Sequence, residues 1–504
     1  MPVTFLIREG TMRGRGLLRL CGGVAGGCSV LALLAGLSTG AGVVEDAPAG
    51  KLLAVDAQPA DPQLVGHQTA AATQFFAENQ TVAARGYQAL TRTAFIPGFW
   101  SLQAYERAWQ QWGVSEKPAD YATAFRERYG LHPAPYPNDG LPMGLRRGQL
   151  LLRPAIAIDC MLCHGSSLLG QSYVGLGNHT LDIHALFEEL FQADGRPVKL
   201  PFTFCNTRGT NEADAFGVYL LGWRQPDMTL RNQWHNLGLR DDSCADVPAW
   251  WLMKKKQTIY YTGGMDSRSV RTLMQFMMHP LTTPADFQRA EPAFREIQQY
   301  LLSLEPPKYP FPIDMAQARR GEAIFRQHCA RCHGTYGPDW TYPNKIIPLE
   351  EIGTDPKRHA AVSIAYGEAY SRSWFGQEPD GWFFRGKRLR WTNGYQAPPL
   401  DGIWATAPYF HNGSVPTLYH VLKSNERPRY FTRSFRTDRE DYDTRRVGWK
   451  FTELKQPADP NLPPIERRKI YDTTQPGRSN AGHTYGDSLT ESQRWDLIEY
   501  LKTL

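Results

Sequence analysis

Two Cys-x-x-Cys-His pentapeptides, Cys160–His164 and Cys329–His333, constrain this 504-residue chain more than any other feature. In this spacing two thiols can bond to the vinyl groups of one haem, and the adjacent imidazole reaches the iron from the same turn. The alternative, one zinc site with four thiolates, leaves the histidine after each pair without a role. The motifs therefore predict two covalently attached haems c, with Cys160, Cys163, Cys329 and Cys332 as thioether residues and His164 and His333 as proximal ligands.

The first 41 residues have the order of a secretory signal peptide. An arginine-rich start precedes an apolar run over residues 20–37, and the small residues Ser38–Ala41 follow. We therefore expect residues 1–41 to be cleaved and the protein to be periplasmic or secreted. A retained N-terminal anchor is the alternative, although this run is interrupted by glycines and barely long enough to span a bilayer. No later stretch is apolar enough, so no stable membrane span is expected after cleavage.

Cys205 and Cys244 are the two cysteines left over after the signal peptide and the haem motifs are set aside. In an oxidising compartment a leftover pair most often forms a disulfide, and we predict one here. Two separate buried thiols are the alternative.

The composition suits a soluble globular protein and excludes one class of partner. Hydrophobic residues make up 42% of the chain, and the formal charge of +6 is spread thinly, without the dense basic tract of a nucleic-acid-binding protein. The 37 prolines and 45 glycines predict long loops around short helices. A proline-rich stretch at 305–312 cannot continue a helix. It marks a boundary between a domain over 42–309 and a domain over 310–504.

An internal repeat supports these two domains. A helix-like segment led by Arg and Gly precedes each motif, at 146–149 and at 319–322. Each domain also ends in a matching apolar stripe, Ile297–Leu304 and Leu497–Leu504, with the i, i+3, i+4, i+7 spacing of one helix face. The fold class expected is mostly α: two cytochrome c-like haem domains with long loops, in which N- and C-terminal helices cross. Aromatic stretches near Trp100 and Trp109 predict an N-terminal helical extension that enlarges the first domain.

A longer motif carries a resemblance. Residues 407–418, Ala-Pro-Tyr-Phe-His-Asn-Gly-Ser-Val-Pro-Thr-Leu, resemble a segment of the bacterial dihaem cytochrome c peroxidase superfamily. Within it the chain looks most like the rubber-oxygenase-like dihaem cytochromes, through Ile352–Pro356, Pro399–Trp404 and Asn480–His483. The similarity covers most of residues 315–504 and is looser around the first motif.

The resemblance implies ligands for the second haem. The peroxidases place a methionine shortly after the 408–418 segment, but Asn425 stands about there, and residues 412–504 contain no Met. The rubber-oxygenase-like proteins use a histidine near the C-terminus, which implies His483 as partner of His333. A bis-histidine iron has a lower potential than a His/Met iron. An exposed loop histidine is the alternative for His483. His411 is expected to pack near the second haem without binding iron.

The resemblance also points to residues near the first haem. Tyr261 corresponds to a tryptophan between the haems and is a candidate redox bridge, as are Trp250 and Trp251. Asp286 corresponds loosely to a catalytic acid, with a plain helix-start aspartate as the alternative. Since the peroxidase Trp and Arg are missing, ordinary peroxidase activity is not expected. The second ligand of the first haem is open among His179, His184, His235, His279, Met274, Met277 and Met278.

Three functions follow as hypotheses. The first is an exported oxidoreductase whose first haem reduces peroxide or activates dioxygen with electrons from the second. The alternative is a pure electron-transfer cytochrome with two six-coordinate haems and no catalytic site. A sensory haem protein is the third. In each case the expected partner is a small redox protein or another electron donor or acceptor, so whether the chain is an enzyme stays open at this point.

Overall fold

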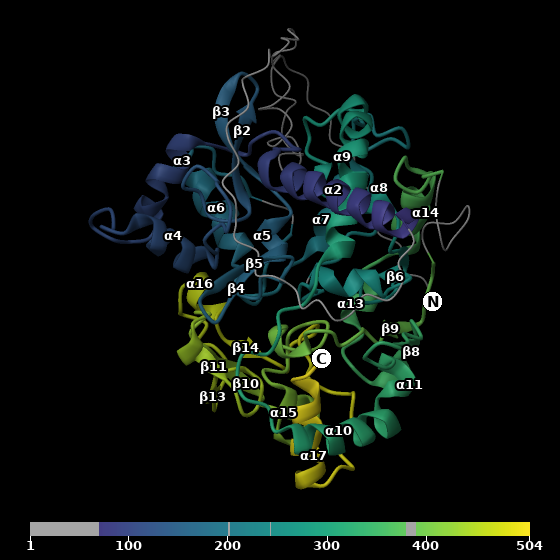
Figure 1. Ribbon diagram of the computed structural model, residues 1–504. Coiled ribbons are helices and arrows are strands. Elements are labelled where there is room, and N and C mark those ends of the chain that lie inside the picture. Colours follow the sequence, from purple (N-terminus) through teal and green to yellow (C-terminus); the bar gives the residue numbers. More distant parts are fainter. Residues whose placement is uncertain (1–69, 200–201, 242, 380–389) are drawn as a thin grey trace, which may run out of the picture. The chain divides into compact units, whose positions relative to one another are not determined.

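The computed structural model describes residues 70–199, 202–241, 243–379 and 390–504, all of which belong to one compact unit (Figure 1). The predicted signal peptide lies outside the described residues. The predicted mostly α fold is wrong: 37% of the described structure is helical and 13% is strand, in several small sheets. Long loops must satisfy their backbone donors and acceptors, and many do so here by pairing in short antiparallel ladders.

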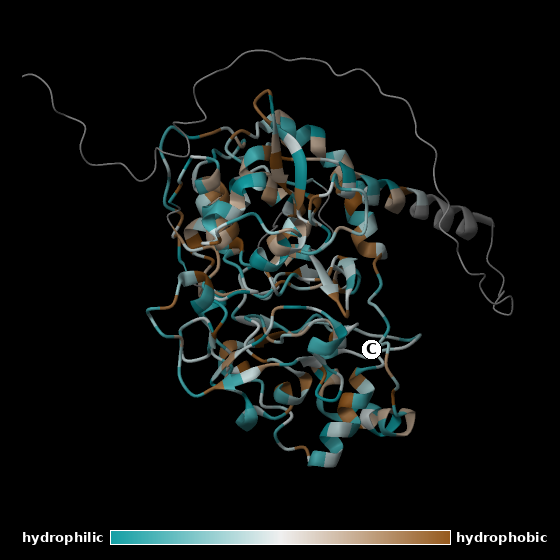
Figure 2. Cartoon of the chain, turned by 90° about the vertical axis from the view of Figure 1, so that its left-hand side faces the viewer, coloured by the Kyte–Doolittle hydropathy of each residue, from teal (hydrophilic) through white to brown (hydrophobic). Residues whose placement is uncertain are grey.

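Two helix pairs form the framework. Helix α2 (Ala70–Arg92) packs on α9 (Pro284–Ser303), and α10 (Met315–His328) packs on α17 (Glu491–Leu501) (Figure 1). The predicted apolar stripes lie in these contacts, with Ile297, Leu301, Leu497 and Leu501 buried. The helices carry hydrophobic and hydrophilic residues side by side (Figure 2), as amphipathic helices on a core do.

A glycine stands at the contact point of each pair. A Cβ at Gly86 of α2 would lie 2.0 Å from the Glu296 carbonyl oxygen, and one at Gly321 of α10 would lie 2.0 Å from that of Asp496. Both distances are shorter than any van der Waals contact, so both pairs need a glycine to approach this closely.

The segment at 146–149 is not a helix, which corrects the sequence prediction. It belongs to strand β2 (Leu145–Leu150), which pairs antiparallel with β3 (Arg153–Ile158); β1 (Trp100–Ser101) pairs with the other edge of β3. The buried Arg146 side chain reaches Asp159 at 2.7 Å and fixes the hairpin. The true counterpart of α10 is therefore α2, which lies much farther upstream of the first haem motif.

Aromatic side chains from both sides of the first motif pack together in the core. Trp100, Phe125, Tyr129 and Phe187 are fully buried in one aromatic cluster. Its elements are α3 (Leu102–Arg107), η1 (Ala108–Gln111), α4 (Tyr121–Tyr129) and α6 (Ile183–Ala193).

Short elements around the first motif connect these helices to α9. They are α5 (Met161–His164), β4 (Gly165–Leu168), β5 (Gln171–Val174), α7 (Ala213–Gly222), η2 (Trp250–Lys254), β6 (Thr258–Ile259), β7 (Met265–Asp266), α8 (Val270–Leu273) and η3 (Met274–Met277).

The C-terminal half is built mainly of loops and short elements. In its largest sheet β10 (Tyr430–Thr432) lies between β13 (Thr452–Leu454) and β14 (Tyr471–Asp472). The other elements are α11 (Ala330–His333), β8 (Ile346–Pro348), α12 (Leu349–Ile352), α13 (Lys357–Ala360), α14 (Ile364–Arg372), β9 (Gly394–Gln396), η4 (Ile403–Ala405), α15 (Leu418–Val421), η5 (Ser424–Glu426), η6 (Arg439–Asp441), β11 (Tyr442–Asp443), β12 (Gly448–Trp449) and α16 (Pro464–Arg467).

Among the described residues, no helix combines the length and the apolar character needed to cross a membrane.

Candidate haem sites

The second Cys-x-x-Cys-His motif presents an imidazole prepared to bind a metal. His333 ends α11, and its Nδ1 lies 2.7 Å from the Pro398 carbonyl oxygen. A carbonyl can only accept, so Nδ1 carries the proton and Nε2 keeps its lone pair for a metal. Burial lowers the pKa of His333, although the Pro398 carbonyl opposes this. The ring is therefore neutral, as a ligand must be.

His483 lies opposite this imidazole, and the ring centroids are 6.3 Å apart. Two metal–imidazole bonds of about 2 Å each, with the two ring radii added, call for about 6 Å between centroids. Burial, and secondarily the charge of a protonated His333, lowers the pKa of His483 to about 3. The spacing and the neutral rings fit one iron between the two histidines.

Backbone contacts hold the loop that carries His483. The His483 amide donates to the Ile352 carbonyl at 2.8 Å. Gly482 has φ +76°, and a Cβ there would lie 2.3 Å from the Gly353 carbonyl carbon. The Arg427 guanidinium donates to the carbonyls of Asn480 (2.6 Å), Gly482 (2.7 Å) and His483 (3.2 Å). Arg427 is thus a positioning residue for His483.

The first motif also ends in a histidine, His164, on a short helix. His164 ends α5, and its ring stacks on Trp250 with centroids 4.7 Å apart and an interplanar angle of 21°. Burial lowers the pKa of His164 to about 4, and the nearby Pro248 backbone opposes this. The Nδ1 of His164 has no hydrogen-bond partner among the described residues, unlike that of His333. Of the two alternative tryptophans, Trp250 supports the proximal imidazole, whereas Trp251 donates to the Asp401 carbonyl at 2.9 Å.

A cavity of about 450 Å³ adjoins Cys160, Cys163 and His164. Cofactor pockets span roughly 300–1,000 Å³ and have mainly apolar walls. Side chains from α5, α7 and α9 supply such walls, and the C-terminal half closes the cavity with Arg358 and Tyr366. The volume, the apolar lining and the motif at its wall fit one haem.

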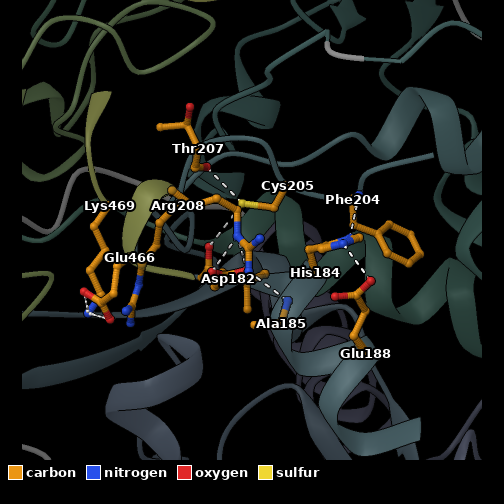
Figure 3. A network of polar contacts seen from close by, with 12 residues as sticks. Asp182, His184, Ala185, Glu188, Phe204, Cys205, Thr207, Arg208, Glu466 and Lys469 are labelled. Carbon is orange, nitrogen blue, oxygen red and sulfur yellow. Dashed lines mark hydrogen bonds and ion pairs between the residues drawn. The ribbon is translucent and has the colours of Figure 1, made fainter. Parts of the chain in front are cut away.

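The candidate histidines for the second ligand of this haem lie elsewhere. Among the described residues that line the cavity, only Met278 of the seven candidates is found. His184 pairs with Glu188 at 3.1 Å (Figure 3), and His235 is exposed. His279 packs edge-on against Phe99, and His179 packs against Trp449.

Polar side chains that the sequence did not single out line the same cavity. The Gln275 amide nitrogen donates to the Tyr260 hydroxyl at 3.2 Å, and its oxygen accepts from the Tyr366 hydroxyl at 3.1 Å. Asp214 and Arg358 form an ion pair at 2.8 Å. These residues come from segments far apart in the chain, so no local sequence motif could predict that they line one cavity.

The same type of turn occurs at 259–265, beside the first site, and at 409–415, in the C-terminal half. Ile259 pairs with Met265, and Tyr409 bridges to Val415. In each turn the second residue has positive φ (Tyr260 +64°, Phe410 +72°) and receives a hydrogen bond from the glycine three positions later (Gly263 and Gly413). Tyr261 and His411 thus occupy equivalent positions.

Tyr261 and His411 also contact each other, with ring centroids 6.0 Å apart. Tyr261 lines the first cavity, while His411 stacks on Tyr395 at 4.2 Å and 20°. Tyr395 packs in the cluster that contains Cys332. The aromatic series Tyr261, His411, Tyr395 therefore runs from one site to the other. The contacts of His411 are those of a packed side chain, in line with its expected role.

Asp286 lies at the start of α9. Its carboxylate accepts from the Thr283 amide at 2.8 Å and hydroxyl at 2.7 Å, and it pairs with Arg289 at 3.3 Å. It is not among the described residues that line the cavity. These contacts are those of a helix cap.

The predicted disulfide is absent, because both Cys205 and Cys244 are free and buried in the described structure. The Cys205 thiol donates to the Thr207 carbonyl at 2.9 Å, beside the Asp182 and Arg208 network in Figure 3. The Cys244 sulfur lies 3.6 Å from the Thr210 hydroxyl. Each thiol packs against its own partners instead of the other sulfur. No three His, Cys, Asp or Glu side chains of the described residues gather in a cluster that could hold a metal ion.

Comparisons with known proteins match parts of the chain. Residues 394–432 match the family described as RoxA-like, cytochrome c-like, and residues 316–370 match the family of cbb3-type cytochrome c oxidase subunit III. Two uncharacterized proteins of Sinorhizobium fredii are similar: y4iM is 29% identical over 51% of this chain, and y4iJ is 32% identical over 40%. The matches span 64% and 41% of these relatives.

The matched segments contain the second Cys-x-x-Cys-His motif, its helix α10 and the turn that carries His411. The chain therefore contains c-type cytochrome sequence with a RoxA-like relation, of the kind that binds haem c covalently.

Proposed function

We propose that the chain is an exported dihaem cytochrome c in which electrons pass between a bis-histidine haem at Cys329–His333 and a haem at Cys160–His164. The observation that carries the proposal is the aromatic series Tyr261, His411, Tyr395 between the two motifs. Bound haem supplies one-electron chemistry at iron. The protein's part is to hold the two groups in one compact unit with aromatic side chains between them.

The two sites have different surroundings, which supports different roles. His333 and His483 can occupy both axial positions at the second site. At the first site none of the candidate histidines is among the described residues that line the cavity, and His359, which lines it together with His164, bonds through its Nε2 to the Thr392 carbonyl at 2.8 Å. Tyr260, Gln275 and Arg358 also line it. These three side chains can hydrogen-bond a small oxygen ligand such as peroxide or dioxygen. The proposal is therefore a redox enzyme whose first site binds such a ligand, with a small redox protein as electron source.

One observation favours the alternative of a pure electron carrier: the Met278 side chain lines the first cavity and would give a six-coordinate His/Met iron.

The experiment is haem quantification followed by EPR and absorption spectra, with and without cyanide. We expect two haems per chain, one low-spin signal that ignores cyanide and one signal that changes with it. Two cyanide-insensitive low-spin signals would favour the carrier, and one haem per chain would overturn the dihaem proposal. A Met278→Leu variant distinguishes the enzyme from the electron carrier. If Met278 is an iron ligand, as in the carrier, its loss creates a new cyanide-sensitive site; in the enzyme the variant leaves the cyanide response unchanged.

A further inference from the structure

A buried lysine lines the first cavity with its charge unpaired. Lys256 is 8% exposed, and no acceptor in the described part of the chain lies within hydrogen-bonding distance of its Nζ. Its two neighbours differ: the Lys254 ammonium pairs with Glu305, and the Lys255 ammonium pairs with Asp401 at 2.7 Å. Neither neighbour lines the cavity in the described structure. Lys256 is thus the one of three consecutive lysines that faces the haem cavity.

Burial lowers the pKa of Lys256 to about 8, with no charged group acting against it. An unpaired buried ammonium is costly, and the cost is recovered only when an anion comes within contact. The acidic side chains on the cavity wall already interact with other groups. Asp159 and Asp214 form ion pairs with Arg146 and Arg358. Glu212 accepts hydrogen bonds from Ser243 and Cys244, and Asp246 interacts electrostatically with Arg433. The anion must therefore come from the occupant of the cavity.

We propose that the Lys256 ammonium binds a propionate carboxylate of the haem attached at Cys160 and Cys163. Haem carries two carboxylates, and an ammonium–carboxylate contact is a strong charge-assisted hydrogen bond. Lysine suits this task because it is a compact point charge that needs no planar partner. The inference rests on the proposed function in that it requires a haem at the first site.

The test compares Lys256→Met with Lys254→Met, a change on the same turn whose side chain points to Glu305. The readouts are haem content, EPR spin state and the midpoint potential of the first haem between pH 5 and pH 9. In the wild-type protein the ammonium keeps the carboxylate ionised, so the potential stays nearly flat. In Lys256→Met the buried carboxylate takes up a proton within this range, because desolvation raises a carboxyl pKa. We expect a potential that becomes pH-dependent and lies below wild type at pH 9, with spin states unchanged.

Two results would overturn the inference. A low-spin to high-spin change in Lys256→Met would make the amine an iron ligand, and a pH profile equal to that of Lys254→Met would mean that no carboxylate faces it. Lys256→Arg should restore the flat profile; if the Met variant fails to mature, Lys256→Gln takes its place. A wild-type chain with one haem would refute the dihaem proposal before any variant is made, so the two failures are distinguishable.

Discussion

The imidazoles of His333 and His483 lie with their ring centroids 6.3 Å apart, although 150 residues separate them in the chain. His333 is held by α11 and the Pro398 carbonyl, and His483 by Ile352 and Arg427. Separate contacts thus hold each histidine in place, and together they set a distance between the two rings that one metal ion can occupy. In metalloproteins such supports around the ligands typically matter 10- to 100-fold for affinity or activity.

Replacing His483 tests this pair. We expect His483→Ala to keep its covalent haem, since both cysteines are intact, but to convert the second site from low-spin to high-spin. EPR measures this change. The control is His420→Ala, because His420 is buried in the same half and its ring nitrogen bonds to Thr417 at 2.7 Å. A low-spin second site in His483→Ala would contradict the assignment.

Arg427 should be required for the geometry of the His483 loop. Arg427→Met removes the donors to the carbonyls of Asn480, Gly482 and His483 and leaves these carbonyls unsatisfied, so we expect a loss of about 3 kcal/mol in unfolding free energy. The second haem should also show a mixed spin state. Denaturant titration and EPR measure these effects. Arg429→Met, at an exposed position nearby, should change neither. Equal behaviour of the two variants would refute the positioning role.

The helix contact at Gly321 should tolerate no side chain. In Gly321→Ala the new Cβ would lie 2.0 Å from the Asp496 carbonyl oxygen, so α10 and α17 must separate. We expect a loss of about 3 kcal/mol in unfolding free energy. Arg319→Ala, on the exposed side of α10, should leave stability within about 0.5 kcal/mol. Chemical unfolding of both variants checks the prediction, and an unaffected Gly321→Ala would contradict the close packing.

Acid should destabilise the fold through buried neutral histidines. Burial, together with the nearby Arg224, lowers the pKa of His279 to about 3. The unfolded chain binds a proton at this residue below about pH 6.5 while the folded chain does not. Stability is therefore complete above pH 6.5 and falls as pH drops towards 3, with a loss of about 3 kcal/mol at pH 4 from this residue.

We expect His279→Gln to flatten the acid limb of the stability–pH curve by that amount, while the exposed His235→Gln follows wild type. Denaturant midpoints between pH 4 and pH 7.5 provide the measurement. An unchanged acid limb in His279→Gln would show that this ring is not held neutral.

Electron transfer between the sites should depend on the aromatic ring at Tyr261. Tyr261→Leu removes the ring that contacts His411, so we expect slower electron transfer by about tenfold, whereas Tyr261→Phe should stay near wild type. Flash reduction of one haem, followed by its oxidation by the other, gives the rate. Equal rates in the Leu and Phe variants would exclude a role for the ring.

Much of each haem motif could be predicted from the sequence because its geometry is local. Cys160 and His164, like Cys329 and His333, lie within one turn, so their relative positions follow from backbone geometry alone. The stripe from Ile297 to Leu304 also predicted a buried helix face, since its 3.6-residue period needs no knowledge of the partner.

The predictions that failed depended on contacts between distant segments. The 146–149 segment reads as helical, yet the strand from Arg153 to Ile158 pairs with it, and the long loops pair likewise into small sheets. The leftover cysteines suggested a disulfide, but Thr207 and Thr210 engage the sulfurs. In each case a partner unknown to the local pattern decided the outcome.

The sequence by itself determined that the chain carries two Cys-x-x-Cys-His motifs and the apolar stripes of two amphipathic helices, because each of these patterns lies within about ten residues. Only the tertiary structure decided which side chains meet around the motifs. The approach of His483 to His333, the contact of Tyr261 with His411 and the position of Lys256 in the first cavity all depend on how long loops pack, and that packing is set by the sum of many weak contacts across the whole chain.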